Sequence, residues 1–281
     1  MIFNLIDKPD DLEFLNQELL QSSHVGVDTE FRRTTKDNMK LSLIQVNDGE
    51  EIYLIDCLQI DYKEENCNFL FSKDVIKIFH SCKEDLEAVF SWTGQNLVNI
   101  FDTQLANAFL GGSYSIGYQD LVIDKIDVKV DKEETRSNWL RRPLTDSQLR
   151  YAASDVEFLS DLYMELEEKL ISENKIDWFY EEITSIIDLK SYLETDSRDQ
   201  NQILSKALQG EFLDELNCIV ESLAQEKEVN KTLLFSKKSQ KLLLHKILNS
   251  NLEEALDNLT TWRKDLISNQ LNQLSKAYDL I

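Results

Sequence analysis

Apolar and polar positions repeat with two periods along the first half of the chain. Apolar residues recur at helical spacing over 10–20, where Asp10 is the expected helix cap. Five short segments instead show the alternation or the continuous apolar run of a strand: 24–31, 41–47, 51–56, 75–80 and 99–102. Between the second and third of these, Asp48 and Gly49 form a strong hairpin signal. Strands that alternate with helices predict an α/β fold with a mixed five-stranded sheet.

Capping signals place the helices that follow the strands. A capping box at Ser81 and Glu84 predicts a helix that begins at Ser81, and Asp102 is expected to cap a helix over 103–110. After a stretch of loop and short helix, a second capping box at Thr145 and Gln148 predicts one long helix to about residue 171.

The pattern changes after residue 190. Residues 191–202 are polar and weakly patterned, as in a linker, and 203–281 shows the apolar spacing of several helices. We therefore predict a first domain over 1–190, a linker over 191–202 and a helical domain over 203–281.

Composition narrows the classes of protein to consider. The 281 residues include 42% hydrophobic residues, only two prolines and seven glycines, which favours long regular elements. Four scattered cysteines form no metal-binding or disulfide pattern, and no signal peptide or membrane span is visible, so a cytoplasmic protein is expected. The net charge of −22 gives no general attraction to nucleic acid, so a nucleic-acid enzyme of this composition would need metal ions and a local basic patch.

Candidate chemistry begins in the segment HVGVDTEF, where Asp28 and Glu30 point to the same face of the predicted strand. Asp85 and Asp155 also stand at predicted helix or strand ends, and Tyr151 lies one helical turn before Asp155. An exposed acidic strand end is the alternative for the first pair. Four carboxylates of this kind suit Mg²⁺ or Mn²⁺, and two such ions can catalyse an in-line phosphoryl displacement. The constellation describes a metal-dependent phosphodiesterase.

The same residues carry a family resemblance. VDTEF, HSCKEDLEAV and YAASD resemble the three exonuclease motifs of the DEDD superfamily, and the tyrosine four residues before the last aspartate resembles its DEDDy branch. DTEFRRT, LSLIQ, FDTQLA and the run DKEETRSNWLRRPLTDSQLRYAASDVEFL are similar to the ribonuclease D family over roughly residues 1 to 190.

This resemblance implies an RNase H-like exonuclease fold and a 3′–5′ exoribonuclease that trims the 3′ ends of tRNA precursors and releases nucleoside 5′-monophosphates. It implies that Asp28, Glu30 and Asp155 hold a first divalent ion, Mg²⁺ or Mn²⁺. Asp28 would bridge to a second ion, which Asp85 holds directly or through water. Tyr151 would position the attacking water.

Several neighbours of these motifs are candidates for substrate binding. Phe31 either stacks on the terminal base or packs in the core. The basic residues near the motifs are Arg32, Arg33, Lys36, Arg136, Arg141, Arg142 and Arg150. We expect about half of them to contact RNA phosphates and the others to be solvated or paired with acids. His80 is expected to be held in hydrogen bonds without acting in catalysis.

The last segment resembles an HRDC (helicase and RNase D C-terminal) domain, a helical bundle that helps to bind nucleic acid. The resemblance is clearest in LLFSKKSQKLLLHKI and TTWRKDLISNQL. Lys237, Lys241 and His245 would form one helical stripe, which either contacts RNA or is a plain solvated face.

Two other functions fit the sequence. The ligands recognise a phosphodiester and no particular sugar, so an exonuclease on single-stranded DNA is one alternative. A non-catalytic RNA-binding protein on an exonuclease fold is the other, although every ligand of the family pattern is present. The expected partner is RNA with a single-stranded 3′ end; no membrane and no obligate protein partner is expected.

Overall fold

The structure is a computed structural model that describes residues 2–35, 38–129, 137–187 and 204–280. The chain forms two compact units, 1–106 with 115–169, and 107–114 with 170–281. This division falls earlier in the chain than the predicted boundary at residue 190. The predicted linker, 191–202, lies outside the described residues, and the domain limits stay a prediction.

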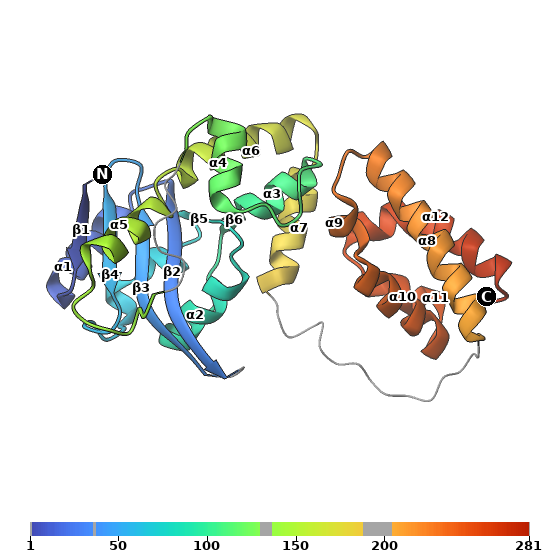
Figure 1. The fold of residues 1–281 in the computed structure, drawn as a ribbon, viewed down its shortest axis with the longest axis horizontal. Helices are drawn as coiled ribbons and strands as arrows, with labels where there is room; N and C mark the ends of the chain where they lie inside the picture. The colour runs from blue at the N-terminus through green and yellow to red at the C-terminus, as the bar shows by residue number, and fades with distance from the viewer. Residues whose placement is uncertain (1, 36–37, 130–136, 188–203, 281) are drawn as a thin grey trace. The chain divides into compact units, whose positions relative to one another are not determined.

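The first unit contains a six-stranded mixed sheet in the order β1-β4-β3-β2-β5-β6 (Figure 1). Its strands are β1 (Phe3–Ile6), β2 (His24–Thr35), β3 (Asn38–Asn47), β4 (Ile52–Asp56), β5 (Ile76–Phe79) and β6 (Ile100–Asp102). The pairs β2–β3 and β3–β4 are antiparallel, whereas β1–β4, β2–β5 and β5–β6 are parallel. The mixed sheet is confirmed, but five strands was wrong, because the four-residue edge strand β1 is too short to show a period.

The hairpin between β3 and β4 forms at the predicted position. Gly49 has a φ of +95°, which a glycine adopts without strain. The Asp48 carboxylate accepts hydrogen bonds from the backbone N–H groups of Glu50 and Glu51. Residues 41–47 of β3 are all buried, as expected for a central strand that is covered on both faces.

Six helices belong wholly or mainly to this unit: α1 (Pro9–Leu19), α2 (Lys83–Thr93), α3 (Thr103–Phe109), α4 (Tyr118–Ile126), α5 (Asp146–Ser154) and α6 (Leu159–Ser172). Two 3₁₀ helices, η1 (Glu64–Asn66) and η2 (Asn68–Phe71), lie between β4 and β5. The N-cap of α1 is Lys8, so the assignment of Asp10 as cap was wrong; Asp10 lies in the first turn, where its charge favours the helix dipole.

The start of α2 also differs from its prediction. Ser81 has a φ of +66° and lies before the N-cap, Cys82, so the predicted capping box does not form. The Asp102 carboxylate instead accepts hydrogen bonds from the backbone N–H groups of Ser81 and Cys82 at the start of α2. It also accepts from Gln104 and Leu105 and so caps α3, as predicted.

The predicted long helix over 145–171 is interrupted. The capping box of Thr145 and Gln148 forms, but α5 ends at Ser154 and α6 begins at Leu159. Residues 155–158 form a turn whose backbone groups bond to side chains from other elements. Helical periodicity continues through this turn, so the sequence pattern alone does not reveal the break.

The second unit is helical, as predicted for the end of the chain. It contains α7 (Ile176–Ile187), α8 (Lys206–Glu226), α9 (Lys231–Phe235), α10 (Lys237–Asn249), α11 (Leu252–Asp257) and α12 (Thr261–Ala277). Trp262 packs edge-on against Phe109, and the Arg263 guanidinium donates to both carboxylate oxygens of Glu182. Within the described ranges, no helix has both the length and the apolar character that a membrane span needs.

Candidate active site

Strand β2 presents two of the predicted ligands. Val27 and Thr29 are buried on one face, so the alternation of the strand turns Asp28 and Glu30 to the other face, where both are partly exposed. The pairing of β2 with β3 shifts register between Glu30 and Phe31. Such a bulge increases the local twist and redirects side chains, and here it directly follows the second carboxylate.

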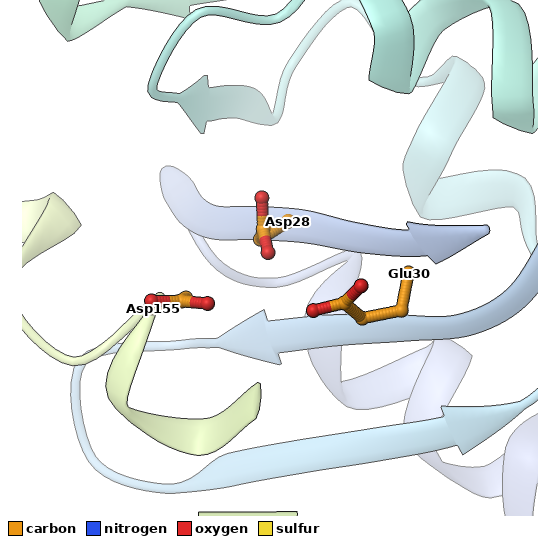
Figure 2. A group of neighbouring side chains, drawn as sticks. All are labelled: Asp28, Glu30 and Asp155. Carbon is orange, nitrogen blue, oxygen red and sulfur yellow. The ribbon is translucent and has the colours of Figure 1, made fainter. Parts of the chain in front are cut away.

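Asp155 completes a cluster of three carboxylates. It directly follows α5, and one carboxylate oxygen from each of Asp28, Glu30 and Asp155 lies within 4.8 Å of the other two. Figure 2 shows Glu30 and Asp155 extending toward one another, with Asp28 beside them. Three converging carboxylates fit a hard divalent cation such as Mg²⁺ or Mn²⁺.

Asp85 lies next to this cluster, outside the three that converge. It is buried in the first turn of α2 and accepts a hydrogen bond of 2.5 Å from the Thr29 hydroxyl. Its charge raises the pKa values of both Asp28 and Glu30. The structure therefore places all four predicted carboxylates close enough for their charges to interact. Asp85 is held by Thr29, the residue between Asp28 and Glu30 on β2.

Burial and mutual repulsion raise the pKa values of the acids in this site. Burial is the main cause for each, and it raises the pKa of Glu30 to about 9 and those of Asp85 and Asp155 to about 7. The pKa of Asp28 is raised well above its usual range by burial and by the charges of Asp85, Asp155 and Glu30. A divalent cation would relieve this cost, because it stabilises the ionised carboxylates.

Tyr151 lies on α5, one turn before Asp155, and its ring packs against Trp139 with centroids 6.1 Å apart. A hydrogen bond from Tyr151 lowers the pKa of Asp155, which partly opposes the effect of burial. Burial and the neighbouring acids raise the pKa of Tyr151 far above its usual value, so the phenol stays protonated at neutral pH. Tyr151 can therefore donate a hydrogen bond at the site and does not act as a base.

Sequence reasoning assigned no role to Gln45, which lies on β3 opposite Asp28. Its side-chain amide donates to Asp28 Oδ2 at 3.4 Å, and its Oε1 is buried with no hydrogen-bond partner among the described residues. A polar residue within the apolar alternation of LSLIQVN was the signal that could have identified it.

The predicted substrate-binding residues are in different environments. Phe31 is partly exposed, and Arg32, Arg141 and Arg150 are exposed. Arg33 is paired with Glu87 at 2.7 Å and with Glu84 at 3.4 Å. Lys36 and Arg136 lie outside the described residues.

Arg142 is held within the fold. Its guanidinium donates to both carboxylate oxygens of Asp56, to the carbonyls of Trp139 and Arg141, and to Ser42. These bonds tie the segment before α5 to β3 and β4. They leave no donor for a phosphate, so we assign Arg142 to the fold and do not carry it into the proposed function.

His80 lies within hydrogen-bond distance of a partner at both ring nitrogens, as expected. Its Nδ1 lies 2.9 Å from Thr103 Oγ1, and its Nε2 lies 3.0 Å from the carbonyl of Ile116. Burial lowers the pKa of His80, so the neutral ring donates through Nε2 to this carbonyl.

Comparison with known proteins gives the family. A profile described as a 3′–5′ exonuclease matches residues 3–171, which is more than half of the chain. The chain belongs to the 3′–5′ exonuclease family. The exonuclease motifs that we identified in its sequence lie within the matched region.

Curated relatives show that, within this family, the chain is similar to ribonuclease D proteins. Ribonuclease D of Pseudomonas paraeruginosa is 42% identical over 164 residues, which are 58% of this chain and 43% of that protein. Ribonuclease D of a Shewanella species is 39% identical over 182 residues, 64% of this chain and 47% of that protein. The chain thus matches less than half the length of these relatives.

Solved structures confirm the fold. The crystal structure of Escherichia coli RNase D aligns with a TM-score of 0.80 at 21% identity and covers 99% of this chain and 100% of that one. NrnC of Brucella melitensis with bound Mg²⁺ aligns with a TM-score of 0.56 at 25% identity, over 70% of this chain and 97% of that one. The predicted combination of an exonuclease domain with a helical region is therefore confirmed.

The raised pKa values give a test of the site without any substrate. In EDTA, the four acids of the site bind more protons in the folded protein than in the unfolded chain above about pH 4, where unfolded Asp and Glu ionise. We therefore expect the Tm of the protein to fall as the pH rises from about 5 to about 8. Asp28→Asn should make this fall smaller, and Mn²⁺ should reduce it in the unsubstituted protein. Thermal scans across this pH range check the prediction, and an equal fall in the Asn variant would contradict it.

Proposed function

We propose that this protein is a metal-dependent 3′–5′ exoribonuclease of the ribonuclease D type. Its substrates are tRNA precursors with single-stranded 3′ extensions, and its products are nucleoside 5′-monophosphates. The observation that carries the proposal is the convergence of Asp28, Glu30 and Asp155, with Tyr151 one helical turn away. The curated relatives support the substrate class, since those reported above are ribonuclease D proteins.

The four carboxylates divide between two metal positions in this proposal. Asp28, Glu30 and Asp155 hold the first divalent ion, because their oxygens converge. Asp28 would also serve the second ion together with Asp85, which would act directly or through water; the Thr29 hydroxyl fixes the Asp85 carboxylate. Two bound ions supply stabilisation of the attacking and leaving oxygens during in-line displacement of the terminal nucleotide.

Tyr151 orients the attacking water in this proposal. Its phenol stays protonated and bonds to Asp155, so the oxygen is held beside the carboxylate cluster. Because this O–H is donated to Asp155, the hydroxyl oxygen can accept a hydrogen bond from a water without changing its own charge. The reaction therefore needs no histidine base, which agrees with the hydrogen-bonded state of His80.

Substrate contacts are assigned to three members of the predicted set that are partly or fully exposed: Phe31, Arg32 and Arg141. Phe31 follows the bulge after Glu30 and stacks on a base at the 3′ end. The two arginines bind phosphates. In the helical region, which we propose to be HRDC-like, Lys237, Lys241 and His245 are exposed along α10 and add a second contact with RNA. We assign the protein to the cytoplasm.

The deciding experiment follows product length over time on a 5′-labelled tRNA precursor with a 3′ extension. A single-stranded DNA of equal length serves as the matched substrate, and each is tested with Mg²⁺, with Mn²⁺ and with EDTA. We expect stepwise, metal-dependent shortening that stops near the mature tRNA end, with slower attack on DNA. Equal rates on the two substrates would indicate a general DEDDy exonuclease, and no shortening of either would indicate a binding protein.

Removal of a ligand should separate activity from stability. We expect Asp28→Asn and Asp155→Asn each to abolish cleavage while leaving the Tm of the metal-free protein unchanged or raised, because each substitution removes mutual repulsion. Cleavage assays and thermal scans in EDTA measure the two effects. Cleavage retained in either variant would refute the metal assignment.

The role of Tyr151 is tested by removing its hydroxyl alone. Tyr151→Phe keeps the ring against Trp139, so we expect turnover to fall by about a hundredfold while RNA affinity changes little. Single-turnover cleavage and equilibrium RNA binding measure the two quantities. If both fell by the same factor, Tyr151 would be a substrate-binding residue.

A further inference from the structure

The turn between α5 and α6 begins at a proposed metal ligand. Two backbone bonds of this turn, 155–158, are long: 3.4 Å from the Glu157 amide to the Ser154 carbonyl, and 3.4 Å from the Leu159 amide to the Val156 carbonyl. We propose that Asn47 and Tyr118 are positioning residues that hold this turn against β2 and so place Asp155 in the carboxylate cluster. The proposal deepens the proposed function and rests on it.

Asn47 binds the turn from the end of β3. Its side-chain amide donates to the carbonyls of Val156 and Glu157, at 3.0 and 3.1 Å. Its Oδ1 accepts from the backbone N–H of Gly49 at 2.9 Å, which fixes the amide orientation from the β3–β4 hairpin. Asn47 is 7% exposed, so these bonds form out of water, where leaving a carbonyl unpaired is costly.

Tyr118 binds the other end of the turn from the start of α4. Its hydroxyl accepts from the backbone N–H of Phe158 at 2.9 Å. Its ring packs edge-on against His80 with centroids 5.8 Å apart, and His80 is itself held at both nitrogens. The hydroxyl is therefore presented from a rigid support.

Gly26 allows the turn to lie close to β2. A Cβ at this position would lie 3.0 Å from Leu159 Cβ, which is tighter than ordinary contact, and 3.4 Å from the Val156 carbonyl oxygen. Gly26 pairs with Asn47 in the register of β2 and β3, two residues before Asp28. Asn47 and the close approach at Gly26 thus act at the same level of the sheet, beside the cluster.

The side chains of Asn47 and Tyr118 take the place of the backbone hydrogen bonds that would extend α5 through the turn. The first residue of the turn, Asp155, still donates to the Tyr151 carbonyl, at 3.2 Å. The following carbonyls and the Phe158 amide then take side-chain partners from β3 and α4. Metal ligands have to stay within roughly 0.5 Å of their productive positions, so loosening the turn should weaken the metal site before it unfolds the domain.

The test measures Mn²⁺ affinity directly, by electron paramagnetic resonance of free Mn²⁺ on the full-length protein. Tyr118→Phe removes one hydroxyl and keeps the ring, and Asn47→Ala removes both donated bonds. We expect each to weaken Mn²⁺ binding by about tenfold. We also expect kcat to fall while KM for the RNA stays close to that of the unsubstituted protein.

Two matched variants control for lost stability. Asn16→Ala removes a buried asparagine that also bonds to backbone groups of a distant segment, at Glu65 and Phe69. Tyr163→Phe removes a buried hydroxyl that donates to Glu167. Both should lower the Tm and leave Mn²⁺ affinity unchanged.

Mn²⁺ affinity that falls no further in Tyr118→Phe and Asn47→Ala than in the two controls would overturn the positioning role. If Asn47→Ala did not fold, Tyr118→Phe against Tyr163→Phe would decide the question. Protein that binds Mn²⁺ without cleaving RNA would refute the proposed function, and the four Mn²⁺ affinities would still decide the role of Asn47 and Tyr118.

Discussion

Repulsion among partly buried carboxylates is the constraint on which this structure depends. Asp28 and Glu30 share one face of β2, and the fold adds Asp155 within 4.8 Å and the charge of Asp85 nearby. The groups that support these acids are neutral donors: Thr29 on Asp85, Gln45 on Asp28 and Tyr151 on Asp155. Among the described residues, no lysine or arginine is a leading cause of the pKa shifts of these four acids. Hydrogen bonds thus orient the carboxylates and leave their negative charge to attract a cation.

The residue pairs of the proposed metal site could be predicted from the sequence because each pair depends on a short-range pattern, whereas the family resemblance indicated that the pairs belong to one site. Asp28 and Glu30 follow from strand alternation, and Tyr151 and Asp155 from a one-turn spacing, which survives even though the helix ends at Ser154. The hairpin at Asp48 and Gly49 was predictable for the same reason, since local backbone geometry decides it.

Several departures from the local sequence pattern involve competition between local and distant partners. Ser81 and Glu84 match a capping box, but the Asp102 carboxylate reaches the same backbone amides from β6 and replaces it. Residues 155–158 look helical until Asn47 and Tyr118, far away in the chain, take their backbone groups. Arg142 stands beside the motifs in sequence, yet its donors are used by Asp56 and neighbouring carbonyls. A sequence pattern indicates which groups could form hydrogen bonds, and the fold determines which of these bonds form.

The charge of the chain limits how it could hold the proposed RNA substrate. A net charge of −22 opposes a polyanion, and Arg33 and Arg142 are already paired with carboxylates. One stretch of the chain is locally basic: residues 229–252, which include α10, contain five lysines and no aspartate or glutamate. Few phosphate contacts release few counterions, so non-specific RNA binding would be weak. Metal ions at the carboxylate cluster would then supply much of the attraction for the 3′-terminal phosphodiester. The same acidic surface that discourages general RNA binding would thus favour substrates that can bring a free 3′ end to the metals.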